Sequence, residues 1–447
     1  MPPTGTLGRR GLLAATGALL VAGRASGGVP VGCGTPPCAF GPTTGWTAAR
    51  AGLEAILDQS LLPFWRGVAD ASTGEGYALN HDLTGRWLGP ANLAVVTQAR
   101  MLWVFAHLRR HGRAAPEDAQ RAERGYAVLT RRFVDPSYGG CFWQLRYQNY
   151  APSKADKQLY AHAFVLFALS EHALVTGSAA AAAAAAGVFE VIDGRFRDPA
   201  SRNYREFLLR DWSTPPADRK DYLGGGGGIR THNTRIHLLE ALTTHYELAR
   251  SARVAGRLAE VVGLTERALV RTPVFCFRVT DGGAPVRQSY GHDLETIHLL
   301  LRARALLGQC GDPPAFYGKV VDDTLRLGED RSLGGIFDSG PIGAGADALA
   351  KKDWAQAETL LTLAELFRLT RQSRRKSAFL RTLDWVGRWQ VDWGHGSWYD
   401  TIGADLKPSG GKAGPWGGPY HTGRAVLGCL RLIDAIQNTP KGGCTPL

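Results

Sequence analysis

Two histidine–glutamate pairs stand at the start of otherwise apolar stretches of the chain. His237 and Glu240 are three residues apart, and His292 and Glu295 repeat this spacing directly after a glycine. Residues three apart lie on one face of a helix, so each pair is expected to point in one direction. Similar polar starts occur in three other segments: Gln98-Ala99-Arg100, Trp354-Ala-Gln-Ala-Glu358 and Tyr420-His421-Thr-Gly-Arg424.

These residue types suit proton transfer. Histidine changes its charge near neutral pH and is the commonest general acid or base. A single histidine in a helix is more often structural than catalytic, but recurrence at several helix starts after glycine-rich loops favours one shared site. Helix starts also present unpaired N–H groups and a positive dipole end, which stabilise a developing oxyanion.

A metal centre is the competing interpretation of the same pairs. Carboxylate di-metal bundles carry Glu-x-x-His on long uninterrupted helices, together with further inward-facing glutamates. Here the order is His-x-x-Glu and long loops interrupt the helices. We therefore predict no metal and no cofactor.

The elements that must position these residues are helices. Apolar residues recur at helical spacing in about a dozen segments, whereas alternation typical of strands is scarce. The predicted helices are 48–62, 97–110, 115–133, 157–176, 179–195, 234–250, 253–269, 292–307, 315–327, 355–370, 374–393 and 422–436.

A small-small-aromatic loop recurs between these helices, mostly at a spacing of about 60 residues, which matches two helices and their connections. Its members are Gly74-Glu75-Gly76-Tyr77, Gly139-Gly140-Cys141-Phe142-Trp143, Gly334-Gly335-Ile336-Phe337 and Gly394-His395-Gly396-Ser397-Trp398, with Arg202-Asn203-Tyr204 as a weaker member. The pattern predicts an all-α (α/α)6 barrel, a toroid of about six helical hairpins. A helical solenoid is the alternative. Gly224–Gly228 is expected to be a lid or a flexible tip.

The composition is that of a globular protein. The chain has 447 residues, 44% hydrophobic and 21% charged, and a formal net charge of +12. The basic residues are spread, without an aromatic-interleaved stripe, so no nucleic-acid partner is predicted. After the N-terminus nothing approaches the ~18 apolar residues of a membrane helix, so no stable membrane insertion is expected. A monomer or a homodimer is expected.

The N-terminus has the pattern of an export signal. Arg9-Arg10 precede an apolar run from Gly11 to Gly23, and small residues follow. Paired arginines are typical of a twin-arginine signal, which predicts a periplasmic or secreted bacterial protein. An ordinary secretory signal or an uncleaved tail is the alternative. The predicted boundaries are 1–27 for the signal, 28–45 for a linker, 46–436 for the barrel and 437–447 for a tail.

The sequence contains seven cysteines, which is an odd number, and their spacing is not that of a zinc site. Cys33 and Cys38 lie close enough in the leader to pair, and Cys444 lies in the tail. The others are expected to be buried free thiols: Cys141, Cys276, Cys310 and Cys429.

Taken in order, the polar segments resemble the N-acylglucosamine 2-epimerase superfamily, which includes mannose isomerases and cellobiose 2-epimerases. The resemblance extends from about Trp46 to Ile436. It rests on Gln98-Ala-Arg100-Met-Leu-Trp103, Lys157-x-x-Tyr160-x-x-Ala-Phe164, Asn233…His237-Leu-Leu-Glu240-Ala, Gly-His292-x-x-Glu295, Trp354-x-Gln-Ala-Glu358 and Tyr420-His421-x-x-Arg424-Ala.

The resemblance implies a sugar in the central cavity of the barrel and a catalytic pair, His292 and His421. One histidine would remove the proton on C2 of an open-chain aldose, and Arg100 would stabilise the enediolate. Return of the proton to C2 gives an epimer and return to C1 gives a ketose. Glu295 is expected to orient His292. The remaining residues implied to support catalysis or bind the sugar are Tyr160, Asn233, His237, Glu240, Trp354, Glu358 and Trp416.

Two departures from the family pattern concern the substrate. Asp353 stands where many members have tryptophan, and Arg235 replaces a second asparagine. Both are expected to change the polarity of the cavity. A glycoside hydrolase or polysaccharide lyase on the same barrel remains an alternative function, with Glu240, Glu295 and Glu358 as its carboxyl groups. A non-catalytic glycan-binding protein is the third possibility.

Overall fold

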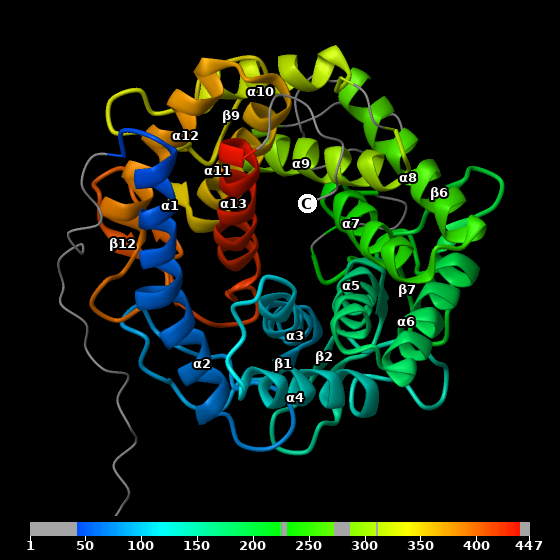
Figure 1. Ribbon diagram of the computed structural model, residues 1–447. Helices are drawn as coiled ribbons and strands as arrows, with labels where there is room; N and C mark the ends of the chain where they lie inside the picture. Colours follow the sequence, from blue (N-terminus) through cyan, green and yellow to red (C-terminus); the bar gives the residue numbers. More distant parts are fainter. Residues whose placement is uncertain (1–42, 224, 226–229, 272–286, 310–311, 439–447) are drawn as a thin grey trace, which may run out of the picture.

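The inner helices of the molecule form a closed ring. The computed structural model describes residues 43–223, 225, 230–271, 287–309 and 312–438. Each inner helix packs against the next, and the last packs back against the first (Figure 1). A solenoid would leave its two ends apart, so that alternative is wrong. The inner helices are α3 (Val95–Arg110), α5 (Leu159–Thr176), α7 (His232–Ala249), α9 (Tyr290–Leu306), α11 (Asp353–Thr370) and α13 (Tyr420–Asn438).

A second ring of helices surrounds the first, each packed on an inner partner. One outer helix consists of α1 (Trp46–Ala55), the π-helical turn η1 (Ile56–Leu61) and α2 (Leu62–Ala71) without a break. The alternation of inner and outer helices along the chain confirms the predicted (α/α)6 barrel. The other outer helices are α4 (Asp118–Arg131), α6 (Ala179–Val191), α8 (Ala252–Arg271), α10 (Ala315–Gly328) and α12 (Ser373–Trp385).

Burial explains why the two rings differ in sequence. Inner helix α5 is buried at every residue from Leu159 to Ala173, whereas α4 buries only a stripe that includes Ala122, Val128 and Leu129. An all-round apolar helix belongs in a core, and a one-sided one belongs at a surface. Among the described residues, α5 alone is long and apolar enough to cross a membrane, and 83% of it is buried inside the barrel.

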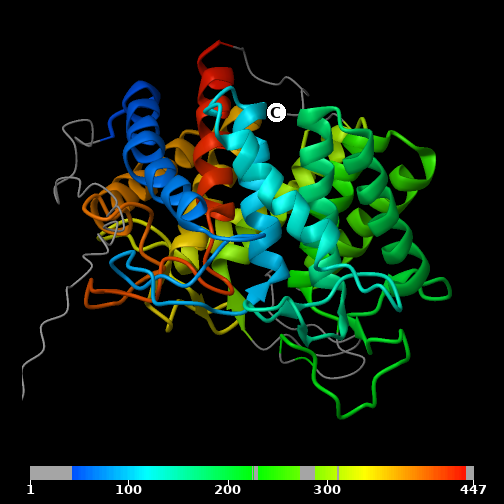
Figure 2. The same cartoon turned by 90° about the horizontal axis from the view of Figure 1, so that it is seen from below.

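Short antiparallel strands lie in the long connections that precede the inner helices. These connections gather at one end of the barrel, where the inner helices begin (Figure 2). Two further π-helical turns, η2 (Ile192–Phe196) and η3 (Val386–Gln390), extend outer helices. The strands are β1 (Leu93–Ala94), β2 (Gln144–Leu145), β3 (Pro152–Lys154), β4 (Lys157–Gln158), β5 (Arg197–Asp198), β6 (Asn203–Tyr204), β7 (Phe207–Leu208), β8 (Gln288–Ser289), β9 (Ser339–Gly340), β10 (Lys351–Lys352), β11 (Thr401–Ile402) and β12 (Pro408–Ser409).

The recurrent glycine loops are held by side chains of the inner helices. The side-chain oxygen of Gln356 accepts a hydrogen bond from the Ile336 N–H at 2.7 Å, and the side-chain NH2 of Gln356 donates one to the Ile336 carbonyl at 2.7 Å. Gln98 makes the same pair of bonds with Tyr77. Gly335 has a φ of +77°, and a Cβ there would lie 2.8 Å from the Gln356 side chain. The close approach explains why glycine precedes the apolar residue.

A buried lysine–aspartate pair closes three of these connections. The distances from lysine Nζ to aspartate Oδ2 are 2.8 Å, 2.8 Å and 2.6 Å for Lys157–Asp135, Lys351–Asp330 and Lys412–Asp392. Each aspartate also accepts backbone N–H groups of its own loop. A buried charge needs such partners, so the pairs fix the loops that carry the entrance of the barrel.

Several predicted features lie outside the described residues: the signal at 1–27, residues 28–42 of the linker, the glycine stretch apart from Gly225, and Cys33, Cys38, Cys276, Cys310 and Cys444. Cys141 and Cys429 are buried free thiols, as predicted. The first predicted helix ends at residue 62, but the structure continues it to Ala71. Helix α13 ends at Asn438 rather than at 436.

Candidate active site

A cavity of about 270 Å³ opens at the end of the barrel where the inner helices begin. It collects the first turns of α7, α9, α11 and α13 together with side chains from α3 and α5. All the site residues predicted from sequence line it except Glu240 and Glu358, which lie directly behind it. The predicted residues in its wall are Arg100, Tyr160, Asn233, His237, His292, Glu295, Trp354, Trp416 and His421.

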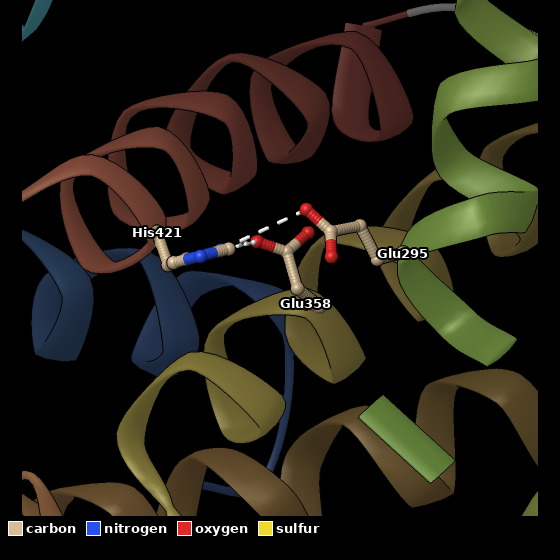
Figure 3. Close-up of side chains that lie close together, drawn as sticks. All are labelled: Glu295, Glu358 and His421. Carbon is tan, nitrogen blue, oxygen red and sulfur yellow. Dashed lines mark hydrogen bonds and ion pairs between the residues drawn. The ribbon is translucent and has the colours of Figure 1, made fainter. Parts of the chain in front are cut away.

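His421 is held by carboxylates behind the cavity. Its Nδ1 lies 2.7 Å from Glu358 Oε1 and 3.8 Å from Glu295 Oε1 (Figure 3). Because Nδ1 of His421 is bonded to Glu358, Nε2 is the ring nitrogen that is available to contact a substrate. Burial, together with the Arg100 and Arg424 cations, holds the pKa of His421 well below its ordinary value. The imidazole is therefore neutral near pH 7, as a base must be.

Arg424 gathers the three glutamates, and sequence analysis did not include it among the site residues. It donates to Glu240, to Glu295 Oε1 at 2.7 Å and to Glu358 Oε1 at 2.6 Å. Burial raises the pKa of Glu295, and Glu358 raises it further. Burial also raises the pKa of Glu358, and Arg424 opposes this rise. The sequence did contain a signal for Arg424, since this residue stands three positions after His421 in the polar segment that begins at Tyr420.

His292 is oriented by a different residue from the one predicted. Its Nδ1 lies 2.7 Å from Ser289 Oγ, at the end of β8, and its ring centroid lies 4.5 Å from that of Trp354. Glu295, expected to orient His292, instead bonds Arg424 and lies beside His421. Burial holds the pKa of His292 well below its ordinary value.

Arg100 lies in the wall with its guanidinium fixed by several contacts. It donates to the Tyr160 hydroxyl at 3.2 Å and to the Trp416 carbonyl at 3.2 Å, and it lies 4.5 Å from the Phe164 ring centroid. Burial raises the pKa of Tyr160 to about 12, so its hydroxyl keeps its proton. Arg100 is thus a preorganised cation in a largely buried position, suited to an oxyanion.

His237 and Asn233 complete this side of the wall. His237 Nδ1 lies 3.3 Å from Glu240 Oε2, the spacing along one helix face that the sequence predicted. The His237 ring centroid lies 6.4 Å from that of His421 and 5.2 Å from that of Tyr160. Asn233 lies in the same wall as Tyr160, so α5 and α7 both contribute polar side chains to the cavity.

The sequence did not predict that two aspartates meet at the mouth of the cavity, a group that we call the acidic rim. Asp353, Asp400 and Lys352 all line it. Burial and the nearby Asp400 raise the pKa of Asp353 to about 8. Lys352 Nζ lies 3.6 Å from Asp400 Oδ2. The sequence had marked Asp353 as a departure, and the structure places it in the cavity; Arg235, the other departure, is not in its wall.

The carboxylates behind His421 also have the spacing of a metal site. One ligand atom each from Glu295, Glu358 and His421 lies within 4.8 Å of the others. Arg424, however, donates to both carboxylates and already supplies the positive charge between them. Since Arg424 already bonds both carboxylates, the proton transfer proposed for this site uses no metal.

The fold and the site together form a barrel whose cavity opens at the starts of the inner helices. The sequence profile of the N-acylglucosamine 2-epimerase (GlcNAc 2-epimerase) family matches residues 76–425. The chain belongs to this family, and as a member of it the protein is a sugar epimerase or isomerase.

Individual relatives agree with this assignment. A cellobiose 2-epimerase of Bacteroides fragilis is 30% identical over 397 residues, which cover 85% of this chain and 97% of the relative. A D-mannose isomerase of Pseudomonas cannabina pv. alisalensis is 26% identical, with 84% and 92% covered. The structure of cellobiose 2-epimerase from Spirochaeta thermophila superimposes with a TM-score of 0.80 at 26% identity, covering 90% of this chain and 100% of that one.

Proposed function

We propose that this protein is a 2-epimerase of reducing sugars and that His421 and His292 transfer the proton at C2. The observation that carries the proposal is the cavity itself, in which the buried His292, the largely buried His421 and Arg100 meet. Buried imidazoles with lowered pKa values are neutral near pH 7 and can act as bases. The contacts that orient each of these side chains assign its role in the reaction.

The first step removes the C2 proton of the open-chain sugar. His421 Nε2 takes the proton, the C2–H electron pair forms the C1=C2 double bond, and the carbonyl oxygen becomes anionic. The Arg100 guanidinium, fixed by Tyr160 and the Trp416 carbonyl, stabilises this oxygen. Glu358 holds the His421 ring by Nδ1 and stabilises the imidazolium that forms.

The second step returns a proton to C2 from the other face. His292, neutral in the free enzyme, first takes up a proton from solvent; it then donates that proton to C2 and becomes neutral again, while His421 keeps the proton it removed. A charge on His421 lowers the pKa of His292, so proton removal by His421 makes the protonated His292 a stronger acid toward C2. Both histidines exchange with solvent before the next turnover. The product is the C2 epimer.

The substrate class is a reducing disaccharide such as cellobiose. The curated relatives that cover most of this chain include several cellobiose 2-epimerases. The acidic rim supports this class because Asp353 and Asp400 can accept hydrogen bonds from hydroxyl groups of a second sugar ring at the mouth. Trp416, which is half exposed there, offers an apolar face for that ring.

Proton NMR of product mixtures tests the proposal. The purified mature protein is incubated with cellobiose, lactose, glucose or mannose, and the anomeric signals are followed. We expect the disaccharides to gain a mannose unit at the reducing end. A ketose product would assign the isomerase reaction instead, and cleavage of the glycosidic bond would contradict the proposal in favour of a hydrolase.

We also propose that the enzyme works outside the cytoplasm. The support is the paired-arginine segment followed by an apolar run at residues 9–23. Expression of the full chain in a bacterial host, followed by cell fractionation, tests this. Export should be lost when Arg9 and Arg10 are replaced by lysine, and export unaffected by that change would contradict a twin-arginine route.

A further inference from the structure

A second cavity lies at the opposite end of the barrel, where inner helices such as α3 and α9 end. About 60 Å³ of it is open to water-sized molecules. Five arginines and three histidines line it, with a single carboxylate, Glu365. This excess of basic groups contrasts with the cavity of the candidate active site, here called the sugar cavity, whose wall holds three carboxyl groups.

Several of these basic groups already have close acidic partners. Arg110 bonds Glu171 at 2.8 Å and Glu247 at 2.6 Å. His298 lies 2.6 Å from Glu365. Arg424 also reaches this cavity, but the glutamates behind the sugar site occupy its guanidinium. These pairs are internal and leave no cation for a ligand.

Arg302 and Arg431 lack such a close acidic partner within the described residues. The sole acidic contact of Arg302 within the described residues is Glu247 at 3.5 Å. Arg431 has neither a hydrogen bond nor an ion pair to any residue in the described part of the chain. Burial and the neighbouring Arg110 lower the pKa of Arg431. Glu247 is therefore a distant acidic neighbour of both guanidinium groups, and Arg110 already bonds it at 2.6 Å.

The helix dipole does not account for Arg431. A cation is favoured only within the last turn of a helix. Helix α13 continues to Asn438, which is about two turns beyond Arg431. The helix dipole therefore supplies no negative charge that would offset the Arg431 cation.

We propose that this cavity binds a small inorganic anion, a halide or an oxyanion such as phosphate, between Arg302 and Arg431. A guanidinium offers such an ion charge-assisted hydrogen bonds. The open volume of about 60 Å³ exceeds the ~10–15 Å³ that one water requires. It is far smaller than the sugar cavity, which excludes a sugar or a nucleotide. The inference is independent of the epimerase reaction.

Melting temperatures separate the site from general salt effects. Wild type, Arg431→Met and Arg302→Gln are melted in rising sodium bromide or sodium phosphate at constant ionic strength, with Arg331→Met on an exposed loop as the matched control. Phosphate also stabilises proteins by exclusion from their surface, and this effect is common to all variants. We expect a saturable increase in wild type and Arg331→Met that both cavity variants lose. Equal responses in all four proteins to both anions would overturn the proposal.

Anomalous diffraction locates the ion. Crystals of the full chain are soaked in sodium bromide and measured at the bromine absorption edge, and an equal set is soaked in sodium phosphate. We expect a peak between the Arg302 and Arg431 guanidinium groups, from bromide if the site takes a halide and from phosphate density if it takes an oxyanion. Surface sites filled by both ions while this cavity holds neither would overturn the proposal.

Discussion

Each end of the inner ring buries a glutamate that a histidine and an arginine share. At the entrance, His421 and Arg424 contact Glu358 at 2.7 Å and 2.6 Å. At the far end, Glu171 takes this position, contacted at 2.8 Å by both His107 and Arg110. The same trio of residue types therefore occurs twice, and by itself does not define a catalytic site.

The charge balance and the space in front of each trio differ. Arg424 alone serves three glutamates, and burial raises the pKa of Glu358. Although burial opposes it, His107 and Arg110 lower the pKa of Glu171 to about 2. The entrance cavity is about 270 Å³ and the far one about 60 Å³. The entrance thus combines more room, three carboxyl groups on one guanidinium and the N–H groups of helix starts.

The largest expected effect compares histidines from the two ends. His421→Asn should lower kcat by a factor of about 10²–10⁴, since general base catalysis contributes that much. His111→Asn, at the far cavity, should leave kcat within about threefold, since it removes no contact with the sugar. Steady-state kinetics on a disaccharide measures both. Similar losses in the two variants would break the distinction between the ends.

Two arginines of α13 test the charge balance. Arg424→Met should lower the free energy of unfolding by about 3–5 kcal/mol, because it leaves three buried carboxylates without their cation. Arg431→Met makes the same chemical change further along the helix but should alter it by less than about 1 kcal/mol. Urea denaturation at low bromide and phosphate measures both. A comparable loss in Arg431→Met would show that the far end has a hidden acidic partner.

The smallest effect concerns the acidic rim. Asp353 has a pKa of about 8, and its charged form accepts stronger hydrogen bonds from a sugar. The KM of wild type should therefore fall severalfold as the pH rises through 8, and Asp353→Asn should abolish this step while kcat changes little. A wild-type KM without an inflection near pH 8 would argue against contact with the substrate.

The same group affects stability with a definite sign. The pKa of Asp353 is raised in the folded state, so folded protein keeps this proton at pH values where the unfolded chain has lost it. The free energy of unfolding should therefore decrease as pH rises from about 4 to about 8. The dependence should be weaker in Asp353→Asn, measured by urea denaturation across this range.

The barrel was predictable from sequence because its signals are local. Helical periodicity located the inner and outer helices, and the glycine loops marked their connections; the reason for the glycines is the close contact between Gly335 and Gln356. The polar starts were visible for the same reason, since His237 and Glu240 are neighbours on one helix face. Such signals depend only on residues close together in the chain.

What sequence could not predict arises from contacts between distant segments. Asp400 reaches Asp353 because strands β10 and β11 pair Lys352 with Thr401. Similarly, His421 is held by Glu358, which stands 63 residues earlier in the chain. The far cavity combines the ends of helices that are widely separated in the chain. Strand register and helix packing determine these contacts, so the spacing of residues in the sequence does not predict them.

Deuterium exchange tests the central claim most directly. The protein is incubated with cellobiose in D2O, and deuterium at C2 of the reducing unit is followed by NMR in wild type, His421→Asn and His111→Asn. The account predicts that wild type and His111→Asn incorporate deuterium at C2 while His421→Asn does not. Epimerisation without incorporation at C2, or full incorporation by His421→Asn, would contradict proton transfer by this histidine.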